Sequence, residues 1–158
     1  MEIMYKNTRD ASEMVTASQA ILNGLANNGG LYVPTEIPKL DVPMEAVSEM
    51  SRFYTDFTEE ELKTCIERAY DEKFDTPNIA ALKVAGRACF LELFHGATVA
   101  FKDMALSILP HLMITAARKN QAKEDIVILT ATSGDTGKAA LEGFSDVEGT
   151  KIIVFYPD

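Results

Sequence analysis

The stretch that decides the fold reads IVILTATSGDTGKAALEGF and covers residues 126–144. Ile126 to Thr130 is a continuous apolar run, which is typical of a strand covered on both faces of a parallel sheet. A tight polar loop with two glycines follows, and Lys138 to Phe144 is predicted to form a short helix. Ile152 to Tyr156 is a second apolar strand. This order predicts parallel strands joined by a right-handed crossover.

The same alternation extends upstream of that stretch. Ala88 to Phe94 is an apolar run of strand length, and apolar residues then recur at helical spacing from Phe101 to Ala116. Pro110 lies inside this helix and is expected to kink or break it. The fold class is therefore α/β, with a βαβαβ unit of a parallel sheet. Three strands make a thin sheet, so we expect the front part of a longer protein, with a minimal complete domain as the alternative.

The first half of the chain is rich in helix signals instead. Capping-box pairs predict two helices, one running to about Ala26 and the other to about Phe74; the pairs are Thr16 with Gln19 and Thr58 with Glu61. Residues 31–33 are predicted to form a short strand. Prolines follow at three positions of an expected extended connector, namely Pro34, Pro38 and Pro43.

A turn-rich segment at residues 75–78 is the best candidate for a domain boundary. It predicts a small, mostly helical N-terminal domain at residues 1–77. Residues 78–158 are then the first part of an α/β domain.

Composition narrows the possible functions. The 158 residues carry a formal net charge of −9, which argues against binding to nucleic acid or to an anionic membrane surface. The apolar runs are too short to span a bilayer, and the N-terminus lacks the apolar core of a signal peptide. Cys65 and Cys89 have no disulfide or metal-ligand spacing, so we expect two reduced thiols in a cytoplasmic protein.

The loop from Thr132 to Gly137 is a candidate anion site, because ligands bind beyond the carboxyl ends of parallel strands. Its glycines admit a ligand close to the backbone, its hydroxyls can donate, and the next helix directs N–H groups at it. It lacks the spacing of a Walker A loop and of a dinucleotide-binding loop. The alternative is a strand-to-helix turn without a ligand.

Lys102 is the second candidate, at the start of the long helix and beside its apolar stripe. The positive end of the helix dipole disfavours a protonated amine there, so Lys102 can serve as a base or form a Schiff base. The alternative is a solvated lysine, and Asp103 is read as an acid that complements the dipole. We expect His95 to be able to hydrogen-bond a ligand and His111 to be solvated, with no metal site.

These segments together resemble the threonine synthase family, whose members use pyridoxal phosphate and have the tryptophan-synthase-β-like fold, PLP fold type II. LELFHGATVAFKD at residues 91–103 resembles the Schiff-base segment, with Ala97 where proline is usual, and TATSGDTG at residues 130–137 matches the substrate loop. GLANNGGLYVP at residues 24–34 matches the N-terminal signature, with Asn28 where aspartate is usual. Positions 5, 8 and 9 fit the opening motif, where Asn7 replaces a usual serine.

The resemblance implies a lyase that makes L-threonine and phosphate from O-phospho-L-homoserine and water. It implies that Lys102 holds pyridoxal 5'-phosphate covalently and then acts as a base, and that Asp135 lies near the ring hydroxyl of the cofactor. The residues that it assigns to the substrate carboxylate are Thr132, Ser133, Gly134 and Thr136. Family members are longer, and their loop for the cofactor phosphate lies further along the sequence. We therefore expect an N-terminal part that is inactive alone and self-associates.

Two other readings stay open at this point. One is a non-catalytic module that binds an anion or amino acid at the Ser133–Gly137 loop. The other is a different fold type II pyridoxal-phosphate enzyme, because the Ser-Gly-Asp-Thr-Gly sequence alone does not separate the members of that fold.

Overall fold

The computed structural model describes residues 2–39 and 45–157 in two compact units. One unit contains Met1–Ile66 and Leu112–Lys123, and the other contains Glu67–His111 and Glu124–Asp158. Pro43, predicted to lie in the extended connector, is outside the described residues. The domain boundary after Pro77 stays a prediction.

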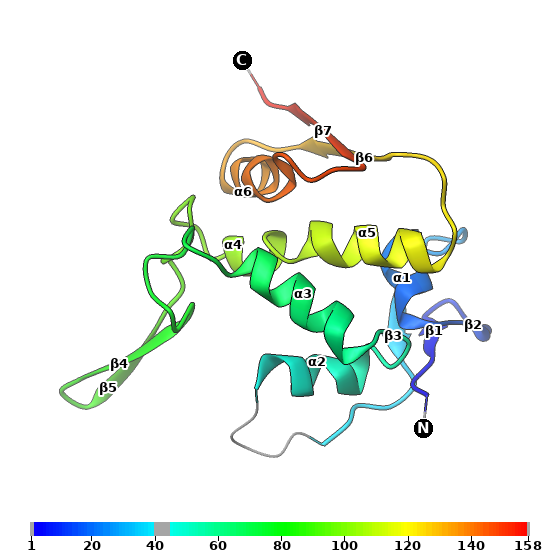
Figure 1. Ribbon diagram of the computed structural model, residues 1–158, viewed down its shortest axis with the longest axis horizontal. Coiled ribbons are helices and arrows are strands. Elements are labelled where there is room, and N and C mark those ends of the chain that lie inside the picture. The colour runs from blue at the N-terminus through cyan, green and yellow to red at the C-terminus, as the bar shows by residue number, and fades with distance from the viewer. Residues whose placement is uncertain (1, 40–44, 158) are drawn as a thin grey trace. The chain divides into compact units, whose positions relative to one another are not determined.

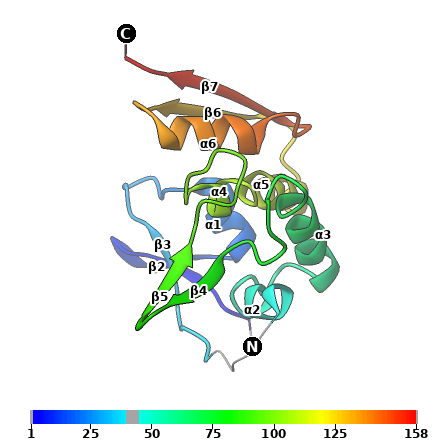
Figure 2. The same cartoon turned by 90° about the vertical axis from the view of Figure 1, so that its left-hand side faces the viewer.

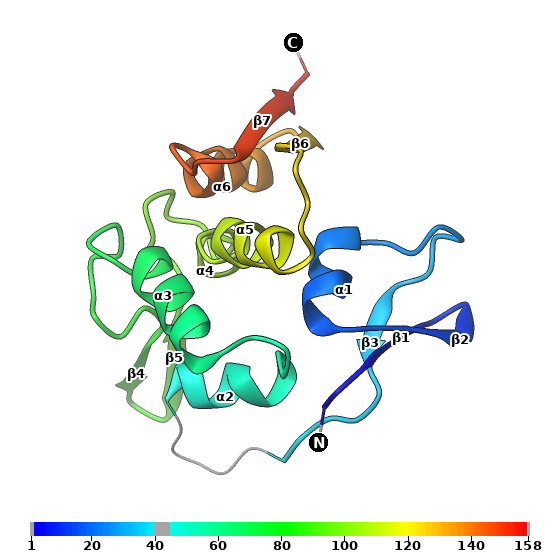
Figure 3. The same ribbon diagram turned by 45° about the vertical axis from the view of Figure 1, so that its right-hand side comes forward.

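The first unit contains a three-stranded antiparallel sheet that the sequence patterns indicated only in part (Figure 3). Its order is β2-β1-β3, and its strands are β1 (Tyr5–Asn7), β2 (Asp10–Val15) and β3 (Tyr32–Pro34). The predicted strand over residues 31–33 is thus present, shifted by one residue. The first two strands were not predicted, because polar residues dominate them.

Side-chain caps begin two helices of this unit as predicted. α1 (Ala17–Asn23) has the complete capping box of Thr16 and Gln19, and it ends before Gly24, earlier than the predicted end. α3 (Glu59–Ala69) is capped by Thr58, whose hydroxyl accepts from the Glu61 N–H at 3.1 Å, and it also ends earlier than predicted. The third helix is α2 (Ala46–Phe53).

A small apolar core joins α3 to the second half of α5 (Leu109–Lys119) within the first unit. Leu62, Cys65 and Ala116 are each at most 2% exposed. At the rim, the Lys119 ammonium lies 3.0 Å from a carboxylate oxygen of Glu61. Apolar residues three or four positions apart on each helix therefore form one buried stripe, as helical periodicity requires.

The second unit departs from the sequence prediction at its first strand. β5 (Ala88–Glu92) pairs with β4 (Ala81–Ala85) in an antiparallel hairpin and not with the parallel strands. Gly86 begins the two-residue turn with φ 63°, a conformation that glycine adopts at little cost. The predicted βαβαβ order is therefore present along the chain, but its first strand belongs to a separate sheet.

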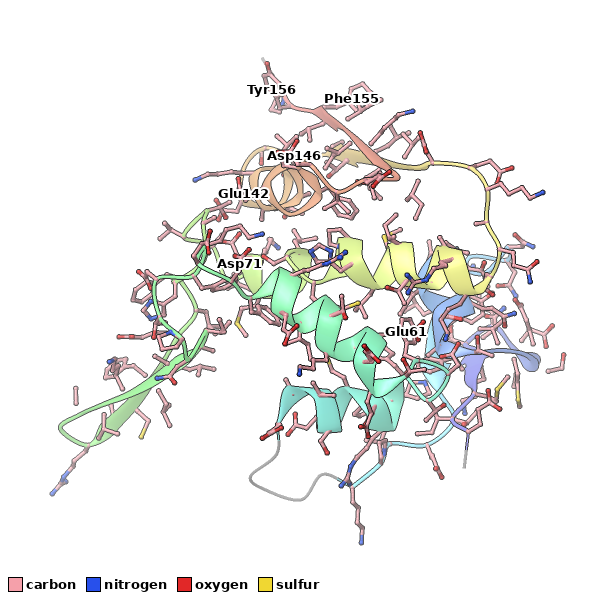
Figure 4. All side chains as sticks on the ribbon, viewed as in Figure 1. Glu61, Asp71, Glu142, Asp146, Phe155 and Tyr156 are labelled. Atoms are coloured by element: carbon pink, nitrogen blue, oxygen red, sulfur yellow. The ribbon has the colours of Figure 1, made fainter. Side chains whose placement is uncertain are left out.

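The predicted strand–helix–strand crossover is present further along this unit. β6 (Ile126–Ala131) and β7 (Thr150–Phe155) are parallel, and α6 (Asp135–Phe144) lies along one face of the pair (Figure 2). The other face is open in the described residues, contrary to the expectation of strands covered on both faces. Its exposed side chains are Val127, Leu129, Ile153 and Phe155. Phe155 and Tyr156 are labelled at the outer end of β7 in Figure 4.

The long helix predicted from Phe101 to Ala116 is two helices. α4 (Asp103–Leu106) ends at Ser107, and α5 begins at Leu109. Pro110 occupies the first turn of α5, where the missing N–H costs no helical hydrogen bond, so the predicted break lies just before the proline. Figure 1 shows the two helices following one another along the chain. No helix among residues 2–39 and 45–157 is both long and apolar enough to cross a bilayer.

A buried amide joins β1 to the segment at residues 24–34. Asn7 is 1% exposed, and its Nδ2 donates to Glu13 at 2.7 Å and to Asn28 at 3.0 Å. Its Oδ1 accepts from the Arg9 N–H at 2.8 Å. Gly30 packs directly against this amide. The signature residues therefore satisfy one another's hydrogen bonds and hold β1 against the loop before β3.

We predict that Gly30→Ala destabilises the protein by about 3 kcal/mol, the combined order of overpacking and of losing a buried hydrogen bond. A Cβ at this position would lie 1.8 Å from the Asn7 Oδ1. Urea unfolding followed by circular dichroism measures the change. Gly24→Ala is the control for backbone strain without overlap, because its φ is +66° and its Cβ meets nothing within 4 Å. Equal losses in the two variants would contradict this packing argument.

Candidate functional site

The glycine-rich loop connects β6 to α6 and has a defined backbone. The Thr132 N–H donates to the Phe155 carbonyl at 3.0 Å, which fixes the start of the loop beside β7. The Gly134 N–H donates to the Thr132 hydroxyl at 3.3 Å. α6 then begins at Asp135, three residues before the predicted start, so the Asp-Thr-Gly part of the loop forms its first turn.

This arrangement presents an anion-binding surface. The first N–H groups of a helix have no partner within the helix, and at α6 they belong to the residues that follow Gly134. Ser133, Gly134 and Thr136 are exposed and Thr132 is half-buried, so hydroxyls and N–H groups of one loop are accessible together. Such a surface suits a carboxylate or a phosphate group. The four residues predicted to bind the substrate carboxylate therefore lie on one loop, and whether they bind it stays a prediction.

Two glycines determine where α6 lies. A Cβ at Gly137 would be 2.0 Å from Thr132 Cγ2, and a Cβ at Gly143 would be 2.1 Å from the Leu106 carbonyl oxygen. The helix thus approaches β6 near its own start and α4 near its own end, closer than any side chain would permit.

Lys102 occupies the N-cap position of α4 and is partly exposed. Its ammonium lies 4.7 Å from the centre of the Phe101 ring. Within the described parts of the chain, no carboxylate forms an ion pair with it. The amine is therefore available to a carbonyl or aldehyde, which is the chemistry predicted for it.

Asp103 lies in the first turn of α4, as expected for an acid that complements the dipole, but it is also buried. It is 3% exposed, and its two carboxylate oxygens accept from Thr98, one from the N–H at 2.8 Å and one from the hydroxyl at 2.5 Å. This pairing was not predicted from the sequence. The available signal was Thr98 in a loop with Gly96, five residues before an aspartate that follows Lys102.

Lys138 also has a role that the sequence did not indicate. Its ammonium donates to the Thr98 carbonyl at 3.3 Å, from the first turns of α6. The structure thereby brings together the segment that contains Lys102 and the helix that follows the glycine-rich loop, both within the second unit.

His95 is held between two carboxylates. Its Nδ1 lies 2.5 Å from Asp75 and its Nε2 lies 3.0 Å from Glu92. The hydrogen bond to Glu92, helped by Asp75, raises the pKa of His95 against the opposing effect of desolvation. Both ring nitrogens therefore already have partners, and His95 joins the end of β5 to the segment before β4 rather than offering a free nitrogen to a ligand.

His111 is half-buried, unlike the solvated residue that was expected. Burial lowers the pKa of its imidazole, and the nearby charges of Arg68 and Lys73 lower it further. Among the residues that the structure describes, no group of three or more histidine, cysteine, aspartate or glutamate side chains is arranged to hold a metal ion.

Comparison with known proteins agrees with the fold. Residues 4–70 match the family model described as the threonine synthase N terminus. Threonine synthase of Schizosaccharomyces pombe is 34% identical, over 99% of this chain and 34% of its own length. Threonine synthase-like 1 of Homo sapiens is 36% identical, over 94% of this chain and 23% of its own length.

A solved structure also matches this chain in three dimensions. The crystal structure of PLP-bound threonine synthase from Brucella melitensis superposes with a TM-score of 0.88 at 31% identity, over 99% of this chain and 36% of that one. The fold and the loops define a pyridoxal-phosphate enzyme fold of type II. The chain belongs to the threonine synthase family, and it spans about a third or less of the length of these relatives.

We predict that Gly137→Ala destabilises the protein by about 2 kcal/mol, because the added methyl group overlaps Thr132 and lies 3.1 Å from Val154. Gly134→Ala in the same loop is the matched control, since its Cβ meets nothing within 4 Å and its φ of 178° suits any residue. Thermal unfolding of both variants gives the comparison. A neutral Gly137→Ala would show that α6 can move away from β6 at no cost.

Proposed function

We propose that this chain supplies the cofactor lysine and the substrate-carboxylate loop of a threonine synthase. The enzyme would use pyridoxal 5'-phosphate to convert O-phospho-L-homoserine and water to L-threonine and phosphate, in the cytoplasm. The observation that carries the proposal is the placement of Lys102 and the Thr132–Gly137 loop within one unit. The similarity to a PLP-bound threonine synthase supports it.

Two contacts between neighbouring segments support a shared site. The Lys138 ammonium contacts the Thr98 carbonyl in the loop before α4, and Gly143 near the end of α6 approaches Leu106 at the end of α4. The turn that contains Lys102 therefore packs against the helix that follows the glycine-rich loop.

The residues present fit the cofactor at the lysine. The Lys102 amine has no carboxylate partner among the described residues, and its side chain is partly exposed, so the aldehyde of the cofactor can reach it. When bound, pyridoxal phosphate supplies an electron sink for the carbanion at the substrate Cα. Lys102 would then take and return a proton at that carbon, since a released amine is a base.

The loop residues would hold and orient the amino-acid substrate. The hydroxyls of Thr132, Ser133 and Thr136 and the exposed backbone at Gly134 would donate to its carboxylate, and the start of α6 favours that negative charge. Asp135, exposed in the first turn, would lie near the ring hydroxyl of the cofactor.

We predict that borohydride reduction of the full-length enzyme in the presence of pyridoxal phosphate fixes the cofactor on Lys102. Peptide mapping by mass spectrometry locates the adduct, and Lys102→Ala should lose nearly all of it because no other lysine lies at that position. Lys83→Ala, on the exposed hairpin, is the control and should keep the adduct. An adduct on Lys138 or Lys83, or no specific adduct at all, would contradict the assignment of Lys102.

We predict that Ser133→Ala in the full-length enzyme raises KM for O-phospho-L-homoserine about tenfold, the effect of losing one hydrogen bond to a charged group. The backbone N–H groups of the loop remain, so kcat should change less. Asp135→Ala should instead alter the visible spectrum of the bound cofactor. Steady-state kinetics and absorption spectra test the two variants. Unchanged KM and kcat in Ser133→Ala would make the loop a simple turn.

We predict that the isolated 158-residue chain self-associates and does not release phosphate from O-phospho-L-homoserine. The open face of β6 and β7 exposes Leu129 at 66% and Phe155 at 60%, and such apolar surfaces associate. Size-exclusion chromatography with light scattering measures the mass. Leu129→Glu should reduce association, whereas Met14→Glu, in the other unit and 53% exposed, should not. A monomeric wild-type chain with steady turnover would contradict both expectations.

A further inference from the structure

Thr98 is bonded on three sides although it lies in an irregular loop. It is 8% exposed. Its N–H and its hydroxyl both donate to the Asp103 carboxylate, and its carbonyl accepts from the Lys138 ammonium. One residue therefore connects the turn that contains Lys102 with α6.

The contact between Thr98 and Asp103 leaves no spare room. A Cβ at Gly96 would lie 2.5 Å from the Asp103 Cβ and 2.6 Å from its Oδ2. Only glycine permits the loop to close over the carboxylate in this way. A buried carboxylate requires such hydrogen-bond partners, because burying an unpaired charge destabilises the folded protein by roughly several kcal/mol.

Backbone strain in the same turn indicates that these bonds hold it in place. Val99 has φ 62°, a conformation that β-branched residues rarely adopt. Its side chain is 68% exposed, so burial of that side chain does not offset the strain. The strain persists only where neighbouring contacts enforce it, and the nearest ones are those of Thr98 and the bond from the Val99 N–H to the Gly96 carbonyl at 3.0 Å.

We propose that Asp103, Thr98 and Lys138 are positioning residues that hold the Lys102 turn in a strained conformation and tie it to α6. Asp103 and Thr98 fix the turn itself, and Lys138 links it to the helix whose N-terminus carries the glycine-rich loop. The two loops then keep a constant separation. The effect of these residues on catalysis rests on the proposed function, whereas their contacts with one another are present without a ligand.

Hydrogen–deuterium exchange of the unligated chain tests the contacts directly. Thr98→Val keeps the shape and the N–H but removes the hydroxyl donor, and it should speed exchange in peptides covering residues 96–103 about tenfold, the equivalent of one charge-assisted hydrogen bond. Lys138→Met should speed it about threefold, and Lys138→Arg should restore the wild-type rate.

Lys151→Met is the matched control. This lysine lies in the same unit, and its ammonium pairs with Asp125 at the surface at 2.6 Å, so its loss should leave exchange over residues 96–103 unchanged. If either Thr98→Val or Lys138→Met exchanges like the wild type in this segment, the proposal is overturned.

Trapping of the cofactor gives a second readout. Borohydride reduction with pyridoxal phosphate should give a lower yield on Lys102 in Thr98→Val than in Lys151→Met, because the amine is no longer held in one place. Faster exchange in Thr98→Val with no adduct on Lys102 in the wild type would contradict the proposed function and leave the positioning role intact. An adduct on Lys102 in the wild type, together with unchanged exchange in Thr98→Val, would support the proposed function and contradict the positioning role.

Discussion

The close approach of α6 to its neighbours is the constraint on which the rest of the second unit depends. Gly137 and Gly143 are six residues apart, which places them about 120° apart around the helix. One allows contact with the side chain of Thr132, directly after β6, and the other allows contact with the Leu106 carbonyl of α4. Because the backbone of the helix itself makes both contacts, the start of the helix, and the loop before it, have little freedom relative to α4.

The sequence predicted those parts of the fold that local signals determine. The capping pairs at Thr16 and Thr58 placed two helix starts correctly, because a capping box needs only four consecutive residues. The apolar runs at β6 and β7 identified the parallel pair. Helix ends were less accurate, since the stop at Gly24 and the break before Leu109 depend on packing as well as on local preference.

Pairing between distant segments could not be predicted in the same way. The run from Ala88 is a strand, and the Gly86 turn before it is a local hairpin signal, but that signal alone does not exclude that the strand also joins β6. The candidate site shows the same division. Lys102 and the Thr132–Gly137 loop were identified from their own residues, whereas Asp103 gained its buried partner, and His95 its two carboxylates, only through folding.

The two cysteines differ in their accessibility to thiol reagents, which allows opening of the first unit to be measured. Cys65 is 2% exposed in the core between α3 and α5, and Cys89 is exposed on the β4–β5 hairpin. A thiol reagent can therefore modify one site at once, while the other becomes reactive only when the first unit opens. The wild-type chain can thus be labelled at a single site on the hairpin without mutagenesis. The rate at which the second thiol then reacts measures how often the core opens.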